Sequence, residues 1–400
     1  MPDDLATTVL ERCDALAAFS EEDGRLTRRF ATDALRMAGD AVEGWMREAG
    51  MTTRRDAIGN VIGRMEGGDG GTLLMGSHLD TVRDAGRYDG PLGVLIAIAC
   101  AERLRGTLPY ALEIYGFADE EGVRYGTAYL GSSVVAGRFD PALLQRRDAD
   151  GIAIAEAIGV EAAALAAAAR DPADLRGYVE VHIEQGPLLE QEDVPVGIVD
   201  AIAGQTRAAV TFTGAAGHAG TVPMDLRHDA LTAAAEWILA VEARARAKEG
   251  LVATVGEARV EPGAGNVIPG RVRLSLDVRH ADDAAREHAV ERLRGRADDV
   301  ASSRDLALEW DVLQETRAVQ CAPPLRDALA AAVRDGGHRV VHLTSGAGHD
   351  AAIMASLTPA AMLFVRCAGG ISHHPSESVD PAHVAAAIAV VMRFLEAYPG

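Results

Sequence analysis

The sequence predicts an α/β fold: a discontinuous α/β domain with a central sheet, interrupted by an inserted ferredoxin-like domain of β-α-β-β-α-β order. Three observations predict it. Helix and strand patterns alternate up to about residue 205 and again after Pro323, which is typical of α/β domains. The segment between them follows a different order. A chain of 400 residues also exceeds one typical compact core. We expect one domain over 1–205 and 316–400, and another over 206–315.

The elements of the discontinuous domain follow from apolar spacing and from the residues that end each run. The first part is expected to contain a helix over Leu26–Glu48, a strand over Thr72–Gly76 that stops at His78, a buried helix over Gly93–Leu104, strands over Tyr110–Phe117 and Tyr178–Ile183, and an Ala-rich helix over Glu161–Arg170. The second part is expected to contain a helix over Leu325–Val333, strands over Arg339–Leu343 and Met362–Val365, and a closing helix over Pro381–Tyr398.

The inserted segment is predicted from one clean alternation. In Arg271–Arg279, apolar and polar residues alternate, so one face of this strand is covered and the other is polar. The apolar positions are Val272, Leu274, Leu276 and Val278. The other expected elements are strands over Ala208–Thr213, Val252–Val260 and Leu306–Leu313, and helices over Arg227–Lys248 and from Asp282 to about Val300.

Composition excludes several classes of partner. Hydrophobic residues make up 48% and charged residues 24% of the chain, as in soluble globular proteins. The formal charge of -20 argues against nucleic acid and against an anionic membrane surface. The four cysteines are far apart, which indicates neither a disulfide framework nor a thiolate metal site. The longest apolar run, Val94–Ala101, is too short to span a bilayer, and no signal peptide is seen. We expect a cytoplasmic protein.

Five residues at expected strand ends, each next to an apolar run, carry the chemistry that this sequence suggests. They are His78, Asp89, Glu121, His182 and His373. Three imidazoles and two carboxylates suit a pair of divalent cations such as Zn, Mn, Co or Ni, because a carboxylate can bridge two cations. Glu120, beside Glu121, is a further carboxylate that could take a proton from metal-bound water. This set predicts a hydrolase with a two-metal centre.

Each of these residues also has an ordinary structural interpretation. His78 followed by Asp80 is either a ligand with a carboxylate that fixes its tautomer or a polar loop. Asp89 before Gly90 is usually a turn. The run Asp119-Glu120-Glu121 is a solvated turn unless a cation offsets its repulsion. His182 could be a hydrogen-bonded core imidazole, and His373-His374 a plain loop. Their expected position at the edge of one sheet favours the metal interpretation.

Other candidates lie in the inserted segment and in a late glycine loop. His218, Asn266 and Arg279 could form a lid that supplies an oxyanion donor, an amide donor and a carboxylate clamp. Their ordinary interpretations are a turn histidine, a turn asparagine and a surface arginine. In Gly346–Asp350 the backbone N–H groups could hold an anion, or Asp350 could cap a helix.

With these segments in view, the chain resembles the amidase, hydantoinase/carbamoylase family of dinuclear metallohydrolases. That family includes N-carbamoyl-L-amino-acid hydrolases, β-ureidopropionases and allantoate amidohydrolases, within the aminoacylase and carboxypeptidase superfamily. The resemblance runs from about Ala57 to Val379. The strings that carry it are Gly76-Ser77-His78-Leu79-Asp80-Thr81-Val82, Asp119-Glu120-Glu121-Gly122, His182-Ile183-Glu184-Gln185-Gly186, His218-Ala219-Gly220-Thr221-Val222-Pro223-Met224 and Ser345-Gly346-Ala347-Gly348-His349-Asp350-Ala351.

The resemblance implies a role for each candidate. His78, Asp89 and His182 would hold one cation, with Asp89 as the bridge, and Glu121 and His373 would complete the second site. Glu120 would be the general base, and Asp80 would support the catalytic group. The substrate-contacting set would be Gln185, His218, Asn266, Arg279, Gly348 and His349. The resemblance also implies a homodimer built through the inserted domain, with His218, and Asn266 as well, reaching into the partner's site. It favours His373 over His374 as ligand.

The implied activity is metal-dependent hydrolysis of a ureido C–N bond in a small carboxylate-bearing substrate, with release of ammonia and carbon dioxide. The sequence does not choose among allantoate, N-carbamoyl-α-amino acids and N-carbamoyl-β-amino acids, and it does not name the metal. An N-acyl-amino-acid deacylase or a peptidase of the same superfamily stays open. So does a metal-stabilised scaffold or sensor without catalysis, against which the presence of Glu120 argues.

Overall fold

The computed structural model describes residues 2–399, which divide into two compact units. The first unit contains the chain up to Asp200 and from Cys321 onward, and the second contains Ala201–Gln320. The second unit is therefore an insertion in the sequence of the first. Within the described residues, every helix is too short or too polar to span a bilayer.

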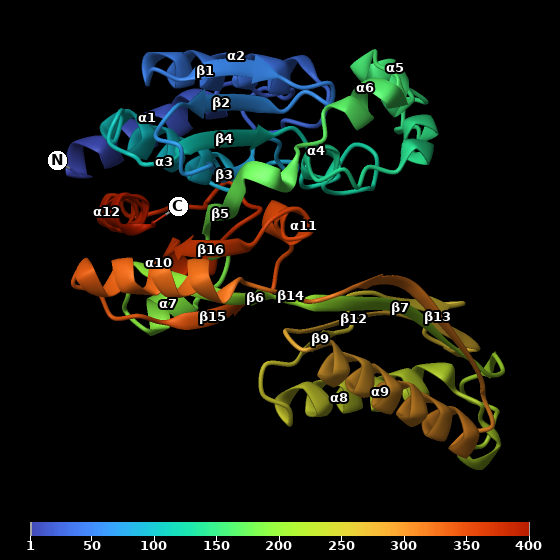
Figure 1. The fold of residues 1–400 in the computed structure, drawn as a ribbon. Helices are drawn as coiled ribbons and strands as arrows, with labels where there is room; N and C mark the ends of the chain where they lie inside the picture. The colour runs from blue at the N-terminus through green and yellow to red at the C-terminus, as the bar shows by residue number, and fades with distance from the viewer. Residues whose placement is uncertain (1, 400) are drawn as a thin grey trace. The chain divides into compact units, whose positions relative to one another are not determined.

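A nine-stranded mixed sheet organises the first unit (Figure 1). Its order is β1-β2-β4-β3-β5-β16-β6-β14, with β15 beside β6. The four central strands β4, β3, β5 and β16 are parallel, whereas β2, β6 and β14 pair antiparallel with their neighbours. The bounds are β1 Thr52–Arg55, β2 Val61–Met65, β3 Thr72–His78, β4 Ala111–Phe117, β5 Leu175–Ile183, β6 Val196–Ile202, β14 Val319–Gln320, β15 His342–Ser345 and β16 Ala360–Val365. Parallel strands bring their carboxyl ends to one edge, where sites in such sheets form.

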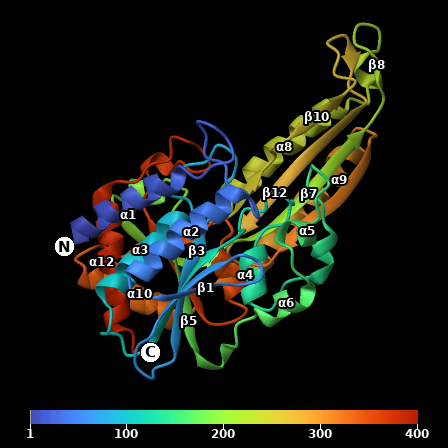
Figure 2. The same cartoon turned by 90° about the horizontal axis from the view of Figure 1, so that it is seen from above.

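Helices cover this sheet closely enough to bury its central strands. All seven residues of β3 and all seven of β4 are buried. The helices are α1 Pro2–Ala17, α2 Asp33–Glu48, α3 Pro91–Arg103, α4 Leu130–Val135, α5 Ile154–Ile158, α6 Ala162–Ala167, α7 Leu188–Gln191, α10 Pro323–Asp335, α11 Asp350–Met354 and α12 Pro381–Ala397. In Figure 2 and in the contacts, α3 packs on β3, β4 and β5, and α1 packs on α3 and α12.

Gly93 allows α3 to approach the sheet. A Cβ atom at this position would lie 1.9 Å from the Val181 carbonyl oxygen of β5. No other residue fits there without displacing the helix. Because α3 begins at Pro91, directly after Asp89 and Gly90, this close packing also places Asp89 beside the ends of the parallel strands.

The second unit contains a five-stranded antiparallel sheet with two helices on one face (Figure 1). Its order is β10-β12-β7-β13, with β9 beside β12. The bounds are β7 Gly204–Thr213, β8 Gly217–His218, α8 Ala230–Arg246, β9 Val252–Thr254, β10 Ala258–Glu261, β11 Val267–Ile268, β12 Arg271–His280, α9 Asp283–Ser303 and β13 Ala307–Thr316. β8 and β11 form a separate two-stranded sheet at one end of this unit (Figure 2).

The alternation predicted in β12 is confirmed. Its four apolar side chains are 0–1% exposed and pack with Phe212, Trp237 and Leu293, whereas Arg273 is exposed. Most of the other predicted helices and strands are present with ends shifted by a few residues. The N-terminal helix α1 and the strands β1, β2 and β6 were not predicted.

The predicted helix over Leu26–Glu48 is wrong in its first part, because α2 begins only at Asp33. The Thr32 side chain accepts a hydrogen bond from Leu35 N and caps the helix. Ala31 has a left-handed φ of 53°, which an α-helix does not accommodate. The preceding residues instead run beside the end of β3, where Arg28 Nε donates to Leu79 O at 2.7 Å.

The single strand predicted over Val252–Val260 is wrong, because the chain forms β9 and β10 with a break between them. The Ser275 side chain of β12 contacts the residues at the break. Its Oγ accepts hydrogen bonds from Gly256 N at 3.2 Å and Glu257 N at 2.9 Å. Ser275 N also donates to Glu257 O at 3.1 Å, so this stretch is bonded to both the side chain and the backbone of Ser275.

Two further predicted elements have the wrong extent. The strand expected over Arg339–Leu343 is β15, His342–Ser345. Arg339 instead holds a loop, with its Nη1 donating to Glu192 Oε2 at 2.9 Å. The Ala-rich helix expected over Glu161–Arg170 is the short α6. Arg170 lies beyond it and pairs with Asp174.

Candidate metal centre

The predicted chemical residues of the first unit gather at the carboxyl ends of its parallel strands. His78 is the last residue of β3, Glu121 follows β4, and His182 is the penultimate residue of β5. Asp89 and His373 are not at strand ends, which corrects that expectation. Asp89 precedes α3, and His373 lies in the loop that follows β16.

Asp89 lies between three imidazoles. Its Oδ1 is 3.1 Å from His182 Nε2 and 3.7 Å from His78 Nε2, and its Oδ2 is 3.1 Å from His373 Nε2. The two oxygens of one carboxylate therefore face different histidines. This is the arrangement that a bridging carboxylate requires.

The donor atoms form two groups that share Asp89. In one group, the ligand atoms of His78, Asp89 and His182 all lie within 4.8 Å of one another, and in the other those of Asp89, Glu121 and His373 do. His373 Nε2 lies 3.3 Å from Glu121 Oε1. The neighbouring His374 instead contacts Ser376 Oγ through Nδ1 at 2.6 Å. Geometry thus brings His373, and not His374, to the carboxylates.

The buried histidines present Nε2 to the centre. His78 Nδ1 lies 3.0 Å from Asp80 O, and His182 Nδ1 lies 2.9 Å from Ile183 O. A carbonyl oxygen only accepts hydrogen bonds, so each Nδ1 carries a proton and donates it. Nε2 of each ring is then available as a ligand atom, as in metal sites where the other ring nitrogen is held by the protein. The donor set therefore fits two divalent cations that accept nitrogen and oxygen ligands.

Asp80 organises the acidic segment after β4. Its Oδ1 accepts a hydrogen bond from Glu120 N at 3.0 Å, and its Oδ2 accepts one from Glu121 N at 3.2 Å. Oδ1 also lies 3.4 Å from His78 Nδ1. One buried carboxylate thus fixes a candidate ligand and the backbone of the proposed base.

The titration of these groups reflects their proximity. Burial would lower the pKa of His78, but contacts with Asp80 and Asp89 outweigh it and raise that pKa well above its usual value. Burial would raise the pKa of Asp89, but hydrogen bonds from three histidines, first His182, hold it well below its usual value. Hydrogen bonds to Asp89 and Glu121 raise the pKa of His373 to about 10. A cation bound here would compete with protons.

Glu120 is buried, so the acidic run is not a solvated turn. Only 8% of Glu120 and 1% of Asp119 are exposed. Burial raises the pKa of Glu120 well above its usual value; His78 opposes this, and Glu121 adds to it. A carboxylate with a raised pKa is a stronger base.

Gln185 and two residues that the sequence did not reveal complete the surroundings of Asp89. Gln185 Nε2 donates to Asp89 Oδ2 at 2.9 Å, and its Oε1 has no hydrogen-bond partner among the described residues. Ser372 Oγ lies 2.9 Å from Asp89 Oδ2, and Glu377 Oε1 accepts from Asp89 N at 3.2 Å. Glu377 is an isolated acid in a polar loop, and only its closeness to His373 in sequence could have drawn attention to it.

Gly348 and His349 lie beside the centre but differ in exposure. A Cβ at Gly348 would lie 1.8 Å from Tyr129 Oη, so a larger residue here would have to displace the end of the Tyr129 side chain. The His349 ring is 1% exposed, stands edge-on to His182 with centroids 4.5 Å apart, and has Nε2 2.8 Å from Ser345 Oγ. Burial, followed by the charge of His182, lowers the pKa of His349 well below its usual value. His349 is therefore a packed, neutral ring.

The three candidates of the second unit lie in two places. His218 in β8 pairs with Val267, which brings it next to Asn266, and Ala219 N donates to Asn266 O at 3.0 Å. His218 and Asn266 are exposed. Arg279 is near the far end of β12, where its Nε donates to Asp277 Oδ1 at 2.8 Å.

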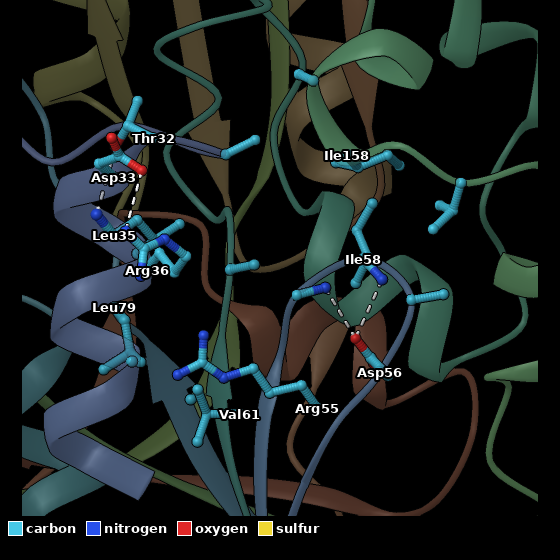
Figure 3. A pocket seen from close by; sticks show the side chains of 18 residues that line it. Thr32, Asp33, Leu35, Arg36, Arg55, Asp56, Ile58, Val61, Leu79 and Ile158 are labelled. Carbon is cyan, nitrogen blue, oxygen red and sulfur yellow. Dashed lines mark hydrogen bonds and ion pairs between the residues drawn. The ribbon is translucent and has the colours of Figure 1, made fainter.

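A cavity of about 450 Å³ lies in the first unit (Figure 3). Apolar side chains such as Leu35, Ile58 and Leu79 line it, and no predicted site residue does. Its arginines already meet acids: Arg55 Nη2 lies 2.7 Å from Asp40 Oδ1, and Arg36 pairs with Asp33 and Asp40. We therefore assign the chemistry to the strand ends and not to this cavity.

The fold and the histidine–carboxylate centre define a class of protein. Comparison with known proteins identifies that class. The model of peptidase family M20/M25/M40 matches residues 74–397, and the chain belongs to this family.

Individual relatives are similar over almost the whole chain. Allantoate deiminase of Arabidopsis thaliana is 39% identical, over 98% of this chain and 82% of its own. An N-carbamoyl-L-amino acid amidohydrolase of Geobacillus stearothermophilus is 41% identical, over 89% of each. Among solved structures, an amidase of the hydantoinase/carbamoylase family from Burkholderia multivorans has a TM-score of 0.91 at 32% identity, over 98% of this chain and 97% of its own. The resemblance to that family is thereby confirmed.

Proposed function

We propose that this chain is a metal-dependent amidohydrolase that cleaves the ureido C–N bond of a small carboxylate-bearing substrate and releases ammonia and carbon dioxide. The observation that carries the proposal is the convergence of His78, Asp89, Glu121, His182 and His373 beside Glu120. The named relatives, an allantoate deiminase and an N-carbamoyl-L-amino acid amidohydrolase, support the ureido substrate class.

The proposed cofactor is two divalent cations per subunit, of Zn, Mn, Co or Ni. When bound, such cations supply a Lewis acid and an activated water. His78, Asp89 and His182 would hold one, and Asp89, Glu121 and His373 the other.

The proposed proton carrier is Glu120. Its carboxylate lies within 4.8 Å of ligand atoms of His78 and Glu121, and its backbone is fixed by Asp80. It would take a proton from the attacking water and give it to the leaving nitrogen. Asp80 would hold both the base and His78 in place during this transfer.

Gln185 is proposed to recognise the ureido group. Because its Nε2 faces the Asp89 carboxylate, which only accepts hydrogen bonds, its Oε1 must point elsewhere. That Oε1 is buried and has no partner among residues 2–399. An N–H group of a ureido substrate would satisfy it. Gly348 and His349 are proposed to complete the wall of the site beside Tyr129 and His182.

The inserted segment, 206–315, is proposed to be a ferredoxin-like lid and dimerisation domain. The chain order β7, α8, β9–β10, β12, α9, β13 supports the ferredoxin-like assignment. β13 is an edge strand of ten residues with Val312 and Leu313 half or more exposed, and an open edge favours pairing with another chain. His218 and Asn266 would act as substrate donors, in the partner's site of a homodimer, and Arg279 as the carboxylate clamp.

We also propose that the protein is cytoplasmic. All four cysteines are buried and unpaired, which suits a reducing compartment.

A substrate panel tests the proposal. Purified protein would be loaded with Mn²⁺ and assayed for ammonia release from allantoate, an N-carbamoyl-L-α-amino acid and N-carbamoyl-β-alanine. N-acetyl amino acids and dipeptides in the same panel test the superfamily alternatives by amine release. Turnover of at least one ureide, well above that of the acyl and peptide substrates, is expected. Cleavage of only the acyl or peptide substrates contradicts the ureido assignment, and no hydrolysis of any substrate favours a scaffold or sensor.

A further inference from the structure

Glu377 connects two segments that lie far apart in the sequence. Only 4% of it is exposed. Its Oε1 accepts hydrogen bonds from the backbone N–H groups of Tyr88 at 2.8 Å and Asp89 at 3.2 Å. Its Oε2 lies 2.9 Å from Ser372 Oγ. One carboxylate therefore joins the segment that carries Asp89 to the segment that carries His373.

Ser372 contacts the side chains of both Asp89 and Glu377. Its Oγ lies 2.9 Å from Asp89 Oδ2 as well as from Glu377 Oε2. Asp89 is thus held at its backbone by Glu377, and Ser372 Oγ lies between the carboxylates of Asp89 and Glu377, where its one hydroxyl proton is shared between them. Because Ser372 directly precedes His373, the same contacts fix where the His373 ring enters the site.

Two residues beside Asp89 have a backbone conformation that their surroundings must stabilise. His373 and Gln185 both have a left-handed φ of 56°, although neither is glycine. Their side chains approach each other at 3.5 Å beside Asp89. A left-handed residue that is not glycine costs about 1–2 kcal/mol and persists only where its surroundings hold it. Glu377 and Ser372 are the contacts that hold the His373 side of this pair.

Gly86 provides the space for Glu377. A Cβ at Gly86 would lie 2.3 Å from Glu377 Cδ and 2.4 Å from Glu377 Cβ. Because the second of these atoms is close to the backbone, a larger residue could not be accommodated by moving only the end of the side chain. The chain segment 86–89 is therefore packed on Glu377 by both contact and hydrogen bonds.

We propose that Glu377 is a positioning residue that sets the distance between Asp89 and His373, and thereby the affinity of the cation held by Asp89, Glu121 and His373. The other group, formed by His78, Asp89 and His182, does not contain His373. Its affinity for a cation therefore depends less on Glu377. This inference rests on the proposed metal centre. It assigns Glu377 no contact with substrate or with the cations.

The proposal is tested by titrating the metal-free, full-length protein with Co²⁺. Calorimetry and visible absorption monitor the binding of each equivalent. The wild type is expected to bind two equivalents. In Glu377→Ala, one equivalent should bind within a few-fold of wild-type affinity, because His78 and His182 keep their places, while the other weakens about 10- to 100-fold, the range for residues that orient ligands. The visible absorption band of the weakly bound Co²⁺, the second equivalent, should lose intensity in this variant. Gly86→Ala should give the same selective loss.

Glu377→Gln distinguishes hydrogen bonding from charge. The glutamine Oε1 can accept from the two backbone N–H groups, and its Nε2 can donate to Ser372 Oγ, which leaves the serine hydroxyl to donate to Asp89. This variant should therefore bind the second cation within a few-fold of wild type. If it is as defective as Glu377→Ala, the positioning role is overturned.

A matched control separates this effect from general destabilisation. Glu113 is a buried carboxylate of β4, 3% exposed, that contacts Arg64 and Tyr115 and no proposed ligand. Glu113→Ala should lower the melting temperature and leave both Co²⁺ affinities unchanged. If Glu377→Ala does not fold, Ser372→Ala replaces it and should weaken only the second equivalent.

The possible failures are distinguishable. A wild type that binds fewer than two equivalents contradicts the metal centre itself. A wild type that binds two, with Glu377→Ala or Ser372→Ala binding both at unchanged affinity, overturns only the role of Glu377.

Discussion

The two units differ in where they bury polar side chains. At the strand ends of the first unit, buried charged groups stand close together, among them His78, Asp80, Asp89, Glu120 and His182. The second unit buries an apolar core and, among its charged residues, only Arg286. Burying a carboxylate without a partner is costly, so a cluster of such groups indicates a site that binds cations. The comparison teaches that the buried groups able to hold cations lie in the first unit, while the second offers exposed groups such as His218.

Removal of metal should have the largest effect and should act on the first unit alone. Chelation is expected to abolish ammonia release.

The stability of the metal-free chain should depend on pH. His373 has a pKa raised to about 10, so its protonated form contributes stability to the metal-free chain below about pH 6.5, and this is lost as pH rises towards 10. Asp89 has a lowered pKa, so its contribution is present above about pH 4 and lost on further acidification.

Melting temperatures of metal-free and Mn²⁺-loaded protein at pH 6, 8 and 10 check this expectation. The gap between the two forms should widen as pH rises, because protons stop competing with the cation. A gap that is constant, or that narrows with pH, would show that His373 and Asp89 do not bind the metal.

Glu120→Gln should produce the next largest effect. Loss of a general base lowers kcat about 10²- to 10⁴-fold. Two cations should still bind, because Glu120 belongs to neither shared group around Asp89. Steady-state kinetics measures kcat, and metal analysis measures the number of cations bound. Glu113→Gln, a buried carboxylate in β4 upstream of Glu120, is the control and should keep kcat. A Glu120→Gln enzyme with near wild-type kcat sinks the base assignment.

Leu276→Ala tests whether the second unit is a separate apolar core. Leu276 is 1% exposed in that core, so its truncation should cost about 2–5 kcal/mol of unfolding free energy. Leu239, which is 67% exposed on α8, should cost less than about 0.5 kcal/mol when changed to alanine. Denaturant unfolding gives both values. Metal affinity should be unchanged in both variants, and a loss of metal in Leu276→Ala would contradict the separation of roles.

Arg279→Ala should have the smallest effect and should appear in KM. Loss of a hydrogen bond to a charged group costs about 1.5–3 kcal/mol, which corresponds to a rise in KM of about tenfold or more for carboxylated ureides. Arg273, exposed on the same strand, is the matched control and should leave KM unchanged when replaced by alanine. Equal KM values for the two variants would place the carboxylate clamp elsewhere.

The sequence predicted the parts of the fold that depend on local pattern. β3 and β4 are fully buried, mostly apolar strands that lead to His78 and to the acidic cluster, and β12 alternates cleanly. The break between β9 and β10 could not be predicted, because the residues there contact the side chain of Ser275 from another strand. The late start of α2 depends on a left-handed Ala31, which residue type does not signal.

The same distinction holds within the site. The types of His78, Asp89 and His182 suggested ligands, and geometry brings them together. Glu377 was missed because its importance comes from backbone N–H groups almost 290 residues away, which no local pattern reveals. His373 reaches Asp89 from a loop because of its left-handed backbone.

Titration of metal-free protein with Mn²⁺, with ammonia release from a ureide followed at each addition, tests the central claim most directly. The two groups that share Asp89 predict that activity rises with added metal and saturates at two equivalents per chain. Full activity without metal, or no ureide hydrolysis with two equivalents bound, would contradict the assignment of a dinuclear ureido hydrolase.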